Sequence, residues 1–306
     1  MANVIEIDSL SKRYGRVEAV RRLDLRVGEG EIFGFLGPNG AGKTTTIRIL
    51  TGFLRPTDGR ASVFGLDSWA DSLRIKERIG FLPDAPRLYD GLSGREFLDY
   101  MTSLQNTGRA VLRQELCDGL ELDGGTLQRK IKGYSHGMRQ KLAIVQSMQH
   151  DPEMVIMDEP TDGLDPLVQH SLFELLSEFK SRGRTVFLSS HNLPEVERLC
   201  DRVGIIRDGT LVAVEAVSEL RSRKLRQLEV VLAGEPPDGD LVLPGVVSLQ
   251  KEGRRIRFVV RGDINPLVRE LARLDLEDLV LEPPHLDDIF MEYYRPDSDE
   301  TDARDG

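Results

Sequence analysis

The sequence predicts an α/β fold with a mainly parallel sheet, and two observations support this prediction. Along residues 154–207, short apolar runs alternate with segments of helical periodicity, as in parallel strands joined by helices. The predicted elements are strands at 155–157, 186–188 and 202–207 and helices at 168–180 and 193–199. In addition, two apolar runs end in residues suited to binding phosphate or metal, and α/β folds bind ligands at the carboxyl ends of strands.

The first half of the chain adds strands and a helical insertion. Short strands are predicted at 4–7, 19–27 and 32–36, separated by glycines. Residues 92–150 carry apolar side chains at helical spacing, and we expect them to form an inserted helical subdomain. Together with the alternating stretch, these segments make up a predicted domain of residues 1–220.

The run 37–44 reads GPNGAGKT and fits the phosphate-binding pattern G-x-x-x-x-G-K-[ST]. It lies between the apolar run 32–36 and the helical run 44–50, which is the context that this pattern requires. The glycines allow successive backbone N–H groups to point at a polyanion, and the helix adds its positive end. Lys43 is expected to reach the β- and γ-phosphates, and Thr44 to bind Mg²⁺. The core is therefore interpreted as that of a P-loop NTPase, and the structural alternative is a glycine-rich turn that matches by accident.

A second part of a nucleotide site is predicted where the apolar run 154–157 ends in Asp158 and Glu159. Asp158 is placed to hold Mg²⁺ through water, and Glu159 to polarise the water that attacks the γ-phosphate. Two adjacent acids at a strand end are also common as a helix N-cap. The functional interpretation therefore depends on the motifs that accompany them.

Those motifs occur in a characteristic order. The run 133–141, GYSHGMRQK, opens a helical pattern for which Ser135 is a suitable N-cap. After the Asp-Glu pair follow the run DGLD at 162–165 and a lone His191 directly after the run 185–190, which contains the predicted strand 186–188. Over about residues 3–220, the order of these motifs closely resembles the ATP-binding cassette ATPases.

The resemblance assigns a role to each motif. It implies that Ser135 and Gly137 belong to the signature motif and bind γ-phosphate across a dimer interface, that Asp165 belongs to the D-loop, and that His191 is the switch histidine. It also implies that Tyr14 stacks on adenine. The residues then expected to contact ATP are Tyr14, Gly37, Pro38, Asn39, Gly40, Ala41, Gly42, Lys43, Thr44 and Thr45. The structural alternatives are a surface aromatic for Tyr14, a solvated histidine for His191 and a helix cap for Asp165.

The sequence departs from the family at three places. The signature reads YSHGM at 134–138 instead of L-S-G-G-Q, a form familiar in drug- and antibiotic-exporter ATPases. Asp162 takes a position that is commonly Ser, Asn or Ala, and no consequence follows from the sequence. Asp84 stands where the family carries Gln or, in this subfamily, Glu. As a possible Mg²⁺ ligand, Asp84 is shorter by one methylene.

A second, smaller domain is predicted beyond the basic stretch 221–224. Strands at 227–233, 255–260 and 279–281 and a helix at 265–274 indicate an α+β accessory domain of residues 225–295. The segment 281–294 resembles the closing helix of bacterial drug-exporter ATPases. Residues 296–306 are acidic and are expected to be disordered.

Composition restricts the possible functions. The formal net charge of -10 argues against nucleic acid as a partner, and Cys117 and Cys200 show neither disulfide nor zinc spacing. No apolar run is long enough for a membrane span and no signal peptide is evident, so we expect a cytoplasmic protein, peripheral on the inner face of the cell membrane.

The function implied by the resemblance is that of a Mg²⁺-dependent ATP hydrolase that energises a bacterial exporter of drugs, antibiotics or lipids. Its expected partners are separate transmembrane permease subunits and a second copy of itself or a paralogous cassette. The alternatives are the ATPase of a nutrient importer and, less in keeping with a single cassette without a long coiled-coil insertion, a cassette protein not involved in transport.

Overall fold

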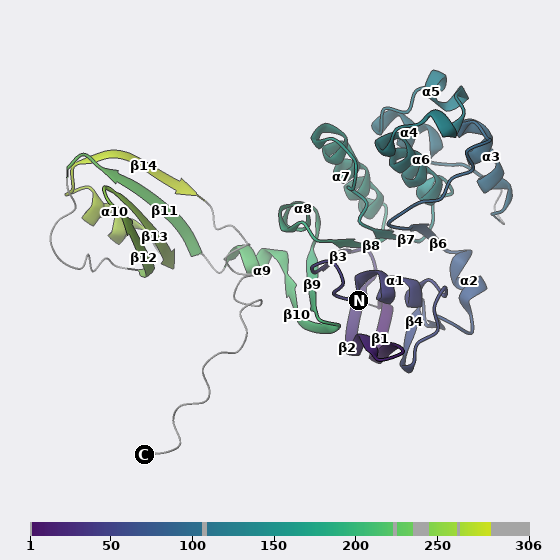
Figure 1. The fold of residues 1–306 in the computed structure, drawn as a ribbon, viewed down its shortest axis with the longest axis horizontal. Helices are drawn as coiled ribbons and strands as arrows, with labels where there is room; N and C mark the ends of the chain where they lie inside the picture. Colours follow the sequence, from purple (N-terminus) through teal and green to yellow (C-terminus); the bar gives the residue numbers. More distant parts are fainter. Residues whose placement is uncertain (1, 106–108, 223–224, 235–244, 262–263, 283–306) are drawn as a thin grey trace, which may run out of the picture. The chain divides into compact units, whose positions relative to one another are not determined.

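The computed structural model describes residues 2–105, 109–222, 225–234, 245–261 and 264–282 (Figure 1). The chain divides into two compact units, Met1–Glu215 and Ala216–Gly306, and each has a hydrophobic core of its own. Across the described ranges, no helix has the length and apolar character needed to cross a membrane.

The first unit is built around a six-stranded sheet with the order β10-β9-β3-β8-β7-β6 (Figure 1). Its strands are β3 (Ile32–Leu36), β6 (Ile79–Leu82), β7 (Met154–Asp158), β8 (Thr185–Ser190), β9 (Arg202–Arg207) and β10 (Thr210–Ala216). The strands from β9 to β6 pair in parallel, which confirms the predicted α/β class. All residues of β3, β7 and β8 are buried, as expected for parallel strands covered on both faces.

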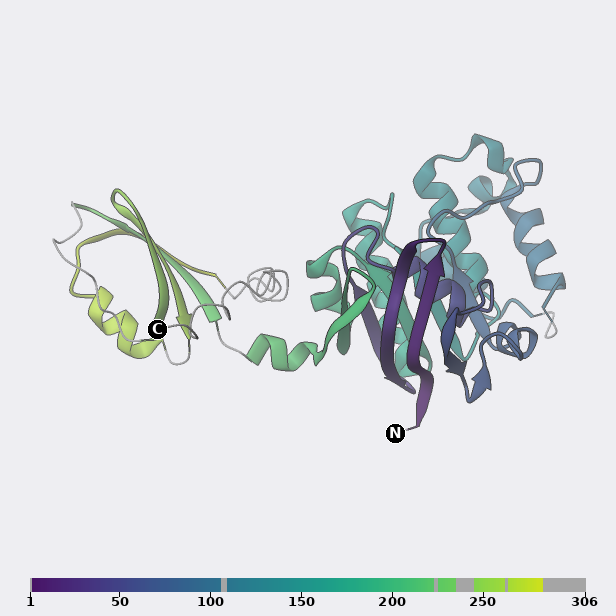
Figure 2. The same cartoon turned by 60° about the horizontal axis from the view of Figure 1, so that its bottom comes forward.

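A separate four-stranded antiparallel sheet has the order β2-β1-β4-β5. It consists of β1 (Asn3–Tyr14), β2 (Val17–Gly28), β4 (Asp58–Val63) and β5 (Leu66–Asp67). Figure 2 shows β1 and β2, in purple, as two long neighbouring strands. The strand predicted at 19–27 is confirmed by β2. The strand predicted at 4–7 was too short, because register shifts between Ile7 and Lys12 let the pairing of β1 continue past the polar residues Ser9 and Ser11.

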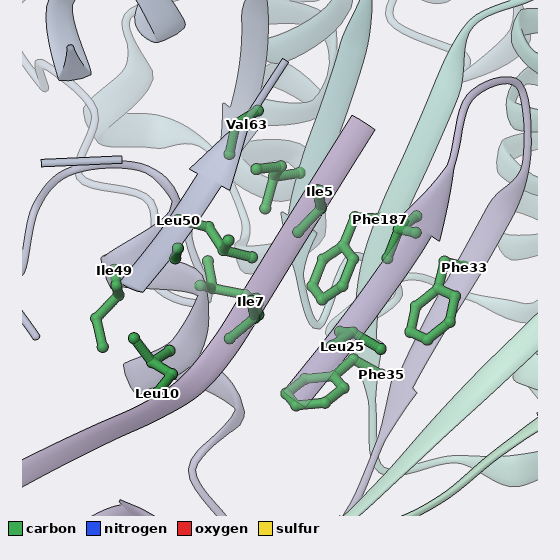
Figure 3. Close-up of a cluster of buried hydrophobic side chains, with 14 of the residues drawn as sticks. Ile5, Ile7, Leu10, Leu25, Phe33, Phe35, Ile49, Leu50, Val63 and Phe187 are labelled. Atoms are coloured by element: carbon green, nitrogen blue, oxygen red, sulfur yellow. The ribbon is translucent and has the colours of Figure 1, made fainter. Parts of the chain in front are cut away.

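The main core lies between the two sheets and helix α1 (Lys43–Leu50). Figure 3 shows Ile5 and Ile7 of β1 facing this core together with Phe33, Phe35 and Phe187 of the parallel sheet. The rings of Phe33 and Phe187 are stacked with centroids 5.7 Å apart. This packing fixes β3, and with it the position of the loop that follows β3.

The remaining helices of the first unit fall into two groups. The predicted helical subdomain contains α3 (Gly94–Ser103), α4 (Arg113–Gly119), α5 (Gly124–Gln128) and α6 (His136–Met148). Outside it lie α2 (Ser72–Lys76), α7 (Pro166–Ser181) and α8 (Leu193–Leu199).

Helix α3 begins with a capping box, in which Ser93 Oγ accepts from the backbone N–H of Glu96 and Glu96 Oε2 accepts from the backbone N–H of Ser93. The latter bond is the main reason why the pKa of Glu96 is lowered to about 2.

The second unit begins with α9 (Val217–Ser222) and then forms an antiparallel sheet with the order β12-β13-β11-β14. Its elements are β11 (Leu225–Leu232), β12 (Val246–Glu252), β13 (Arg255–Arg261), α10 (Asn265–Leu271) and β14 (Leu276–Glu282). Leu267 and Leu271 of α10 belong to the same buried cluster as Val230 and Phe258 of the sheet. The closing segment from 283 onward and the acidic tail 296–306 lie outside the described residues.

Candidate active site

The phosphate-binding loop joins β3 to α1 at the carboxyl edge of the parallel sheet. Pro38, Asn39 and Gly40 form its exposed tip, whereas Gly37, Ala41, Gly42 and Lys43 are buried. Gly42 has φ 109°, and a Cβ atom at this position would lie 2.5 Å from the carbonyl oxygen of Ala19. Only glycine fits there. The half-buried Thr44 and Thr45 follow in the first turn of α1.

The ammonium group of Lys43 is buried inside this loop, with only 5% of the residue exposed. Its Nζ atom donates to the carbonyl oxygens of Gly37 at 2.6 Å and Pro38 at 3.3 Å. It also lies 3.1 Å from Oε1 of Glu159. A buried cation enclosed by backbone dipoles and one carboxylate is suited to receiving a phosphate oxygen.

Asp158 ends β7 beside the loop and is 1% exposed. Its Oδ1 atom accepts a 2.6 Å hydrogen bond from Ser189 Oγ of the neighbouring strand β8. Burial raises the pKa of Asp158, hydrogen bonds from Ser189 and Thr44 oppose this rise, and the negative charges of Asp84 and Glu159 add to it. The structure therefore brings Thr44, Asp84, Asp158 and Glu159 into one electrostatic environment.

The donor chemistry of this environment fits Mg²⁺. A carboxylate whose charge is disfavoured by burial and by other carboxylates gains from a nearby cation. Hydroxyl and carboxylate oxygens are also the ligands that Mg²⁺ prefers, and it usually takes one or two of them together with phosphates. The described part of the chain contains no group of three or more His, Cys, Asp or Glu side chains arranged for a metal.

Glu159 connects the loop to the end of β8. Its Oε2 atom lies 2.9 Å from Nδ1 of His191, its backbone N–H donates to Ser189 Oγ at 3.0 Å, and its φ of 51° is left-handed. An ionised carboxylate only accepts hydrogen bonds, so Nδ1 of His191 carries the proton in this contact. The imidazole is 59% exposed, whereas the carboxylate side chain is only 13% exposed. Strained backbone of this kind is often found at functional sites.

The signature residues form a second group at the start of α6. Ser135 is the predicted N-cap and accepts from the backbone N–H of Met138 at 3.2 Å. Gly137 lies against the turn before α7, where a Cβ atom on it would be 2.7 Å from the carbonyl oxygen of Gly163. Asp165 caps α7 by accepting from the N–H groups of Leu167 and Val168, both at 3.1 Å. The signature start and the D-loop turn are therefore in contact within one chain.

Gln140 connects the helix that starts at the signature residues with the turn that contains Glu159. Its Nε2 atom donates to the carbonyl oxygens of Pro160 at 3.1 Å and Glu159 at 3.4 Å, and the residue is 1% exposed. This residue was not predicted from the sequence, although Ala143 and Ile144, three and four positions further on, share its buried side of α6.

Two residues at which the sequence departs from the family pattern, His136 and Asp162, lie close together in the structure. Nε2 of His136 lies 3.4 Å from Oδ2 of Asp162, with 64% and 58% of the side chains exposed. A Cβ atom on Gly163 would lie 2.1 Å from the His136 ring. No role could be predicted for Asp162 from the sequence, because its partner His136 is 26 positions away in the chain (162 minus 136).

Tyr14 lies at the end of β1, where Lys12 Nζ is 5.4 Å from the centroid of its ring. The residue is 46% exposed. An aromatic ring exposed to this degree offers a surface on which a planar base can stack.

Comparison with known proteins agrees with this geometry. The family model described as ABC transporter matches residues 20–162. The bacitracin transport ATP-binding protein BcrA of Bacillus licheniformis is 38% identical over 91% of this chain and 96% of its own length. A fluoroquinolones export ATP-binding protein of Mycobacterium tuberculosis is 39% identical over 76% of this chain and 77% of its own.

Among solved structures, an ATP-binding subunit of an ABC transporter superposes with a TM-score of 0.66 at 30% identity, covering 71% of this chain and 92% of that one. The loop around a buried lysine, the Asp-Glu strand end and the match to BcrA over 91% of this chain all lead to the same conclusion. The chain belongs to the ABC transporter family and carries its ATP-binding and ATP-hydrolysing cassette.

Proposed function

We propose that this chain is the ATPase subunit that energises a bacterial exporter of drugs, antibiotics or lipids. The names of the bacitracin and fluoroquinolone relatives support export over nutrient import. In this proposal the chain lies on the cytoplasmic face of the cell membrane and docks on separate transmembrane permease subunits, through Asp84 and the helical subdomain.

The hydrolytic roles follow from the contacts of Glu159. Its carboxylate takes a proton from the attacking water, the water oxygen bonds to the γ-phosphorus, and the bond to the β-phosphate oxygen breaks. Lys43 and the backbone N–H groups of the loop stabilise the negative charge on the departing β-phosphate. His191 holds the carboxylate in place through its Nδ1 proton. The bridging position of Glu159 between Lys43 and His191 is the observation that carries this proposal.

Thr44 and Asp158 would hold Mg²⁺, with Asp84 as a further possible ligand. When bound, the ion neutralises charge on the β- and γ-phosphates. The residues themselves orient the site: Ser189 fixes one oxygen of Asp158, and Thr44 favours the ionised form of the same carboxylate by lowering its pKa.

Ser135, Gly137 and Asp165 are proposed to act on the ATP of a second cassette, either another copy of this chain or a paralogue. Ser135 and Asp165 are exposed, so both are available to a partner. Since each chain supplies one loop and one signature, two chains complete two sites when they meet head to tail. ATP then favours the dimer and hydrolysis releases it.

The experiment that tests the export function uses the bacterium that carries the gene. Deletion of the gene should raise the intracellular accumulation of at least one drug, antibiotic or lipid in a panel, and the wild-type gene should restore efflux. The Glu159→Gln variant, expressed at the same level, should not restore it. Loss of uptake of a nutrient, with efflux unchanged, would favour the importer instead.

A further inference from the structure

The carboxylate of Glu195, in the first turn of α8, joins three hydrogen-bond donors. Its Oε2 atom accepts from Thr161 Oγ1 at 2.8 Å and from Ser190 Oγ at 3.2 Å. Its Oε1 atom accepts from Asn192 Nδ2 at 3.0 Å. Glu195 has no part in the proposed hydrolytic chemistry and was not predicted as a site residue.

These donors belong to the two segments that carry Glu159 and His191. Ser190 and Asn192 are the immediate neighbours of His191, and Thr161 lies two residues beyond Glu159. The carbonyl oxygen of Ser190 also accepts from the N–H of Gly37, the first residue of the phosphate-binding loop, at 3.2 Å. One carboxylate therefore fixes both flanks of the histidine and the turn that follows the general base.

A simple capping role does not explain this arrangement. A glutamate three residues after an N-cap usually accepts from the backbone N–H of that cap. Here the backbone N–H of Asn192 donates instead to Ser190 Oγ at 2.9 Å, and Glu195 bonds to Thr161 on another segment. Ser190 and Thr161 are 1% and 7% exposed, so their hydroxyls depend on protein acceptors. Hydrogen bonds to an ionised group are also stronger than neutral ones.

We infer that Glu195 is a positioning residue that holds His191 against Glu159 by fixing Ser190, Asn192 and Thr161. The inference rests on the proposed roles of Glu159 and His191. Without the carboxylate, the two loops are free to move apart. A displacement of about 1 Å at a reacting group can cost on the order of a hundredfold in rate. The loss should fall on the hydrolytic step, because Lys43 and the phosphate-binding loop remain intact.

The test compares Glu195→Ala and Glu195→Gln with a matched control, Glu174→Gln, which changes a glutamate that is 70% exposed on α7. For each full-length variant we would measure kcat and KM for ATP hydrolysis, the Kd of a fluorescent ATP analogue and the urea midpoint of unfolding. We expect kcat to fall by about tenfold or more in Glu195→Ala, with Kd within about twofold of wild type. The kcat of Glu195→Gln, which keeps the shape of the side chain but loses its charge, should lie between the values of wild type and Glu195→Ala. The kcat of the control should match that of wild type.

A double-mutant cycle with His191→Ala separates positioning from general structural support. If Glu195 acts through His191, Glu195→Ala should lower kcat by less than about threefold in the His191→Ala background. The inference would be overturned if Glu195→Ala lowered kcat by the same factor in both backgrounds. It would also be overturned if Glu195→Ala weakened nucleotide binding, seen as a larger Kd, while kcat stayed unchanged. If His191→Ala alone keeps the wild-type kcat, the role proposed for His191 fails and the inference fails with it. If Glu195→Ala alone keeps the wild-type kcat while His191→Ala does not, only the inference fails.

Discussion

Nδ1 of His191 lies 2.9 Å from one oxygen of the Glu159 carboxylate, and Nζ of Lys43 lies 3.1 Å from the other. The carboxylate proposed as the general base is thus held from both sides, by Lys43 at the start of α1 and by His191 directly after β8. A base held in this way loses little freedom when it takes a proton from water. Under the proposed mechanism, this arrangement separates nucleotide binding, which is assigned to Lys43, from proton transfer, which is assigned to Glu159.

Glu159→Gln should therefore bind ATP but hydrolyse it between about a hundredfold and ten-thousandfold more slowly than wild type, the range that a positioned general base contributes. Lys43→Ala should instead weaken nucleotide binding. Steady-state ATPase assays and the Kd of a fluorescent ATP analogue distinguish the two effects. Wild-type turnover by Glu159→Gln, in a preparation free of contaminating ATPases, would show that Glu159 is not the base.

Local motifs predicted most of this site. The phosphate-binding loop, the Asp158-Glu159 strand end and the N-cap at Ser135 each depend on residues close together in the chain, where spacing and chemistry can be read directly. The parallel sheet was predictable for the same reason, since its apolar strands and helices alternate without interruption. Parallel register then places the strand ends at one edge, where Leu36 pairs with Ser190 and Asp158 with Ser189.

The contacts that connect the motifs could not be predicted. Gln140 bonds to Pro160, Glu195 to Thr161, and His136 pairs with Asp162. The partners are distant in sequence, so no local pattern predicts these contacts. The shift in register within β1 was missed because an irregular pairing leaves no regular alternation in the sequence. Long-range packing decides such details.

The isolated chain should dimerise only when it binds ATP and does not hydrolyse it. In Glu159→Gln we expect light scattering to give the mass of a dimer with ATP and of a monomer with ADP, because the γ-phosphate is proposed to bridge two chains. Ser135→Arg, introduced into Glu159→Gln, is the control, since a large cation at the exposed start of α6 should block the dimer without changing the phosphate-binding loop. Equal masses with ATP and ADP would contradict a γ-phosphate-dependent interface.

The pair His136–Asp162 should add little to the stability of the isolated chain. Exposed pairs are typically worth about 0–1 kcal/mol, and both side chains are more than half exposed. Urea unfolding of His136→Gln, Asp162→Asn and the double variant should thus give free energies within about 1 kcal/mol of wild type. A coupling energy well above 1 kcal/mol would mean that the pair is an essential part of the folded turn.

Buried His150 should make the fold less stable in mild acid. Burial lowers the pKa of His150, and the backbone of Ile79 and the charge of Asp151 oppose this without reversing it. The unfolded chain, with a histidine pKa near 6.5, then binds more protons than the folded chain once the pH falls below that value. The contribution of His150 to the free energy of unfolding is fully present above about pH 6.5. Below that pH it decreases by at most about 1.4 kcal/mol per pH unit, until the pH has fallen through the lower pKa of the folded state.

His150→Gln should remove this contribution. The difference in free energy of unfolding between pH 7.5 and pH 5.5, measured with urea, should be smaller in His150→Gln than in wild type. Since other groups titrate over the same interval, the comparison between the two proteins is the informative quantity. Identical pH dependence would show that His150 is not kept neutral by the fold.

Asp84→Glu should raise the ATPase rate of the isolated chain. The negative charge of Asp84 raises the pKa of Asp158, the carboxylate proposed for the metal, but the Asp84 side chain is shorter by one methylene than the usual glutamate. A bridging water can replace a direct contact for binding, whereas geometry near the attacking water is less forgiving. We therefore expect faster hydrolysis with little change in the Kd for ATP, and Asp84→Asn as the control should not accelerate it. An unchanged or lower rate in a folded, ATP-binding Asp84→Glu protein would mean that Asp84 is already well placed or takes no part in hydrolysis.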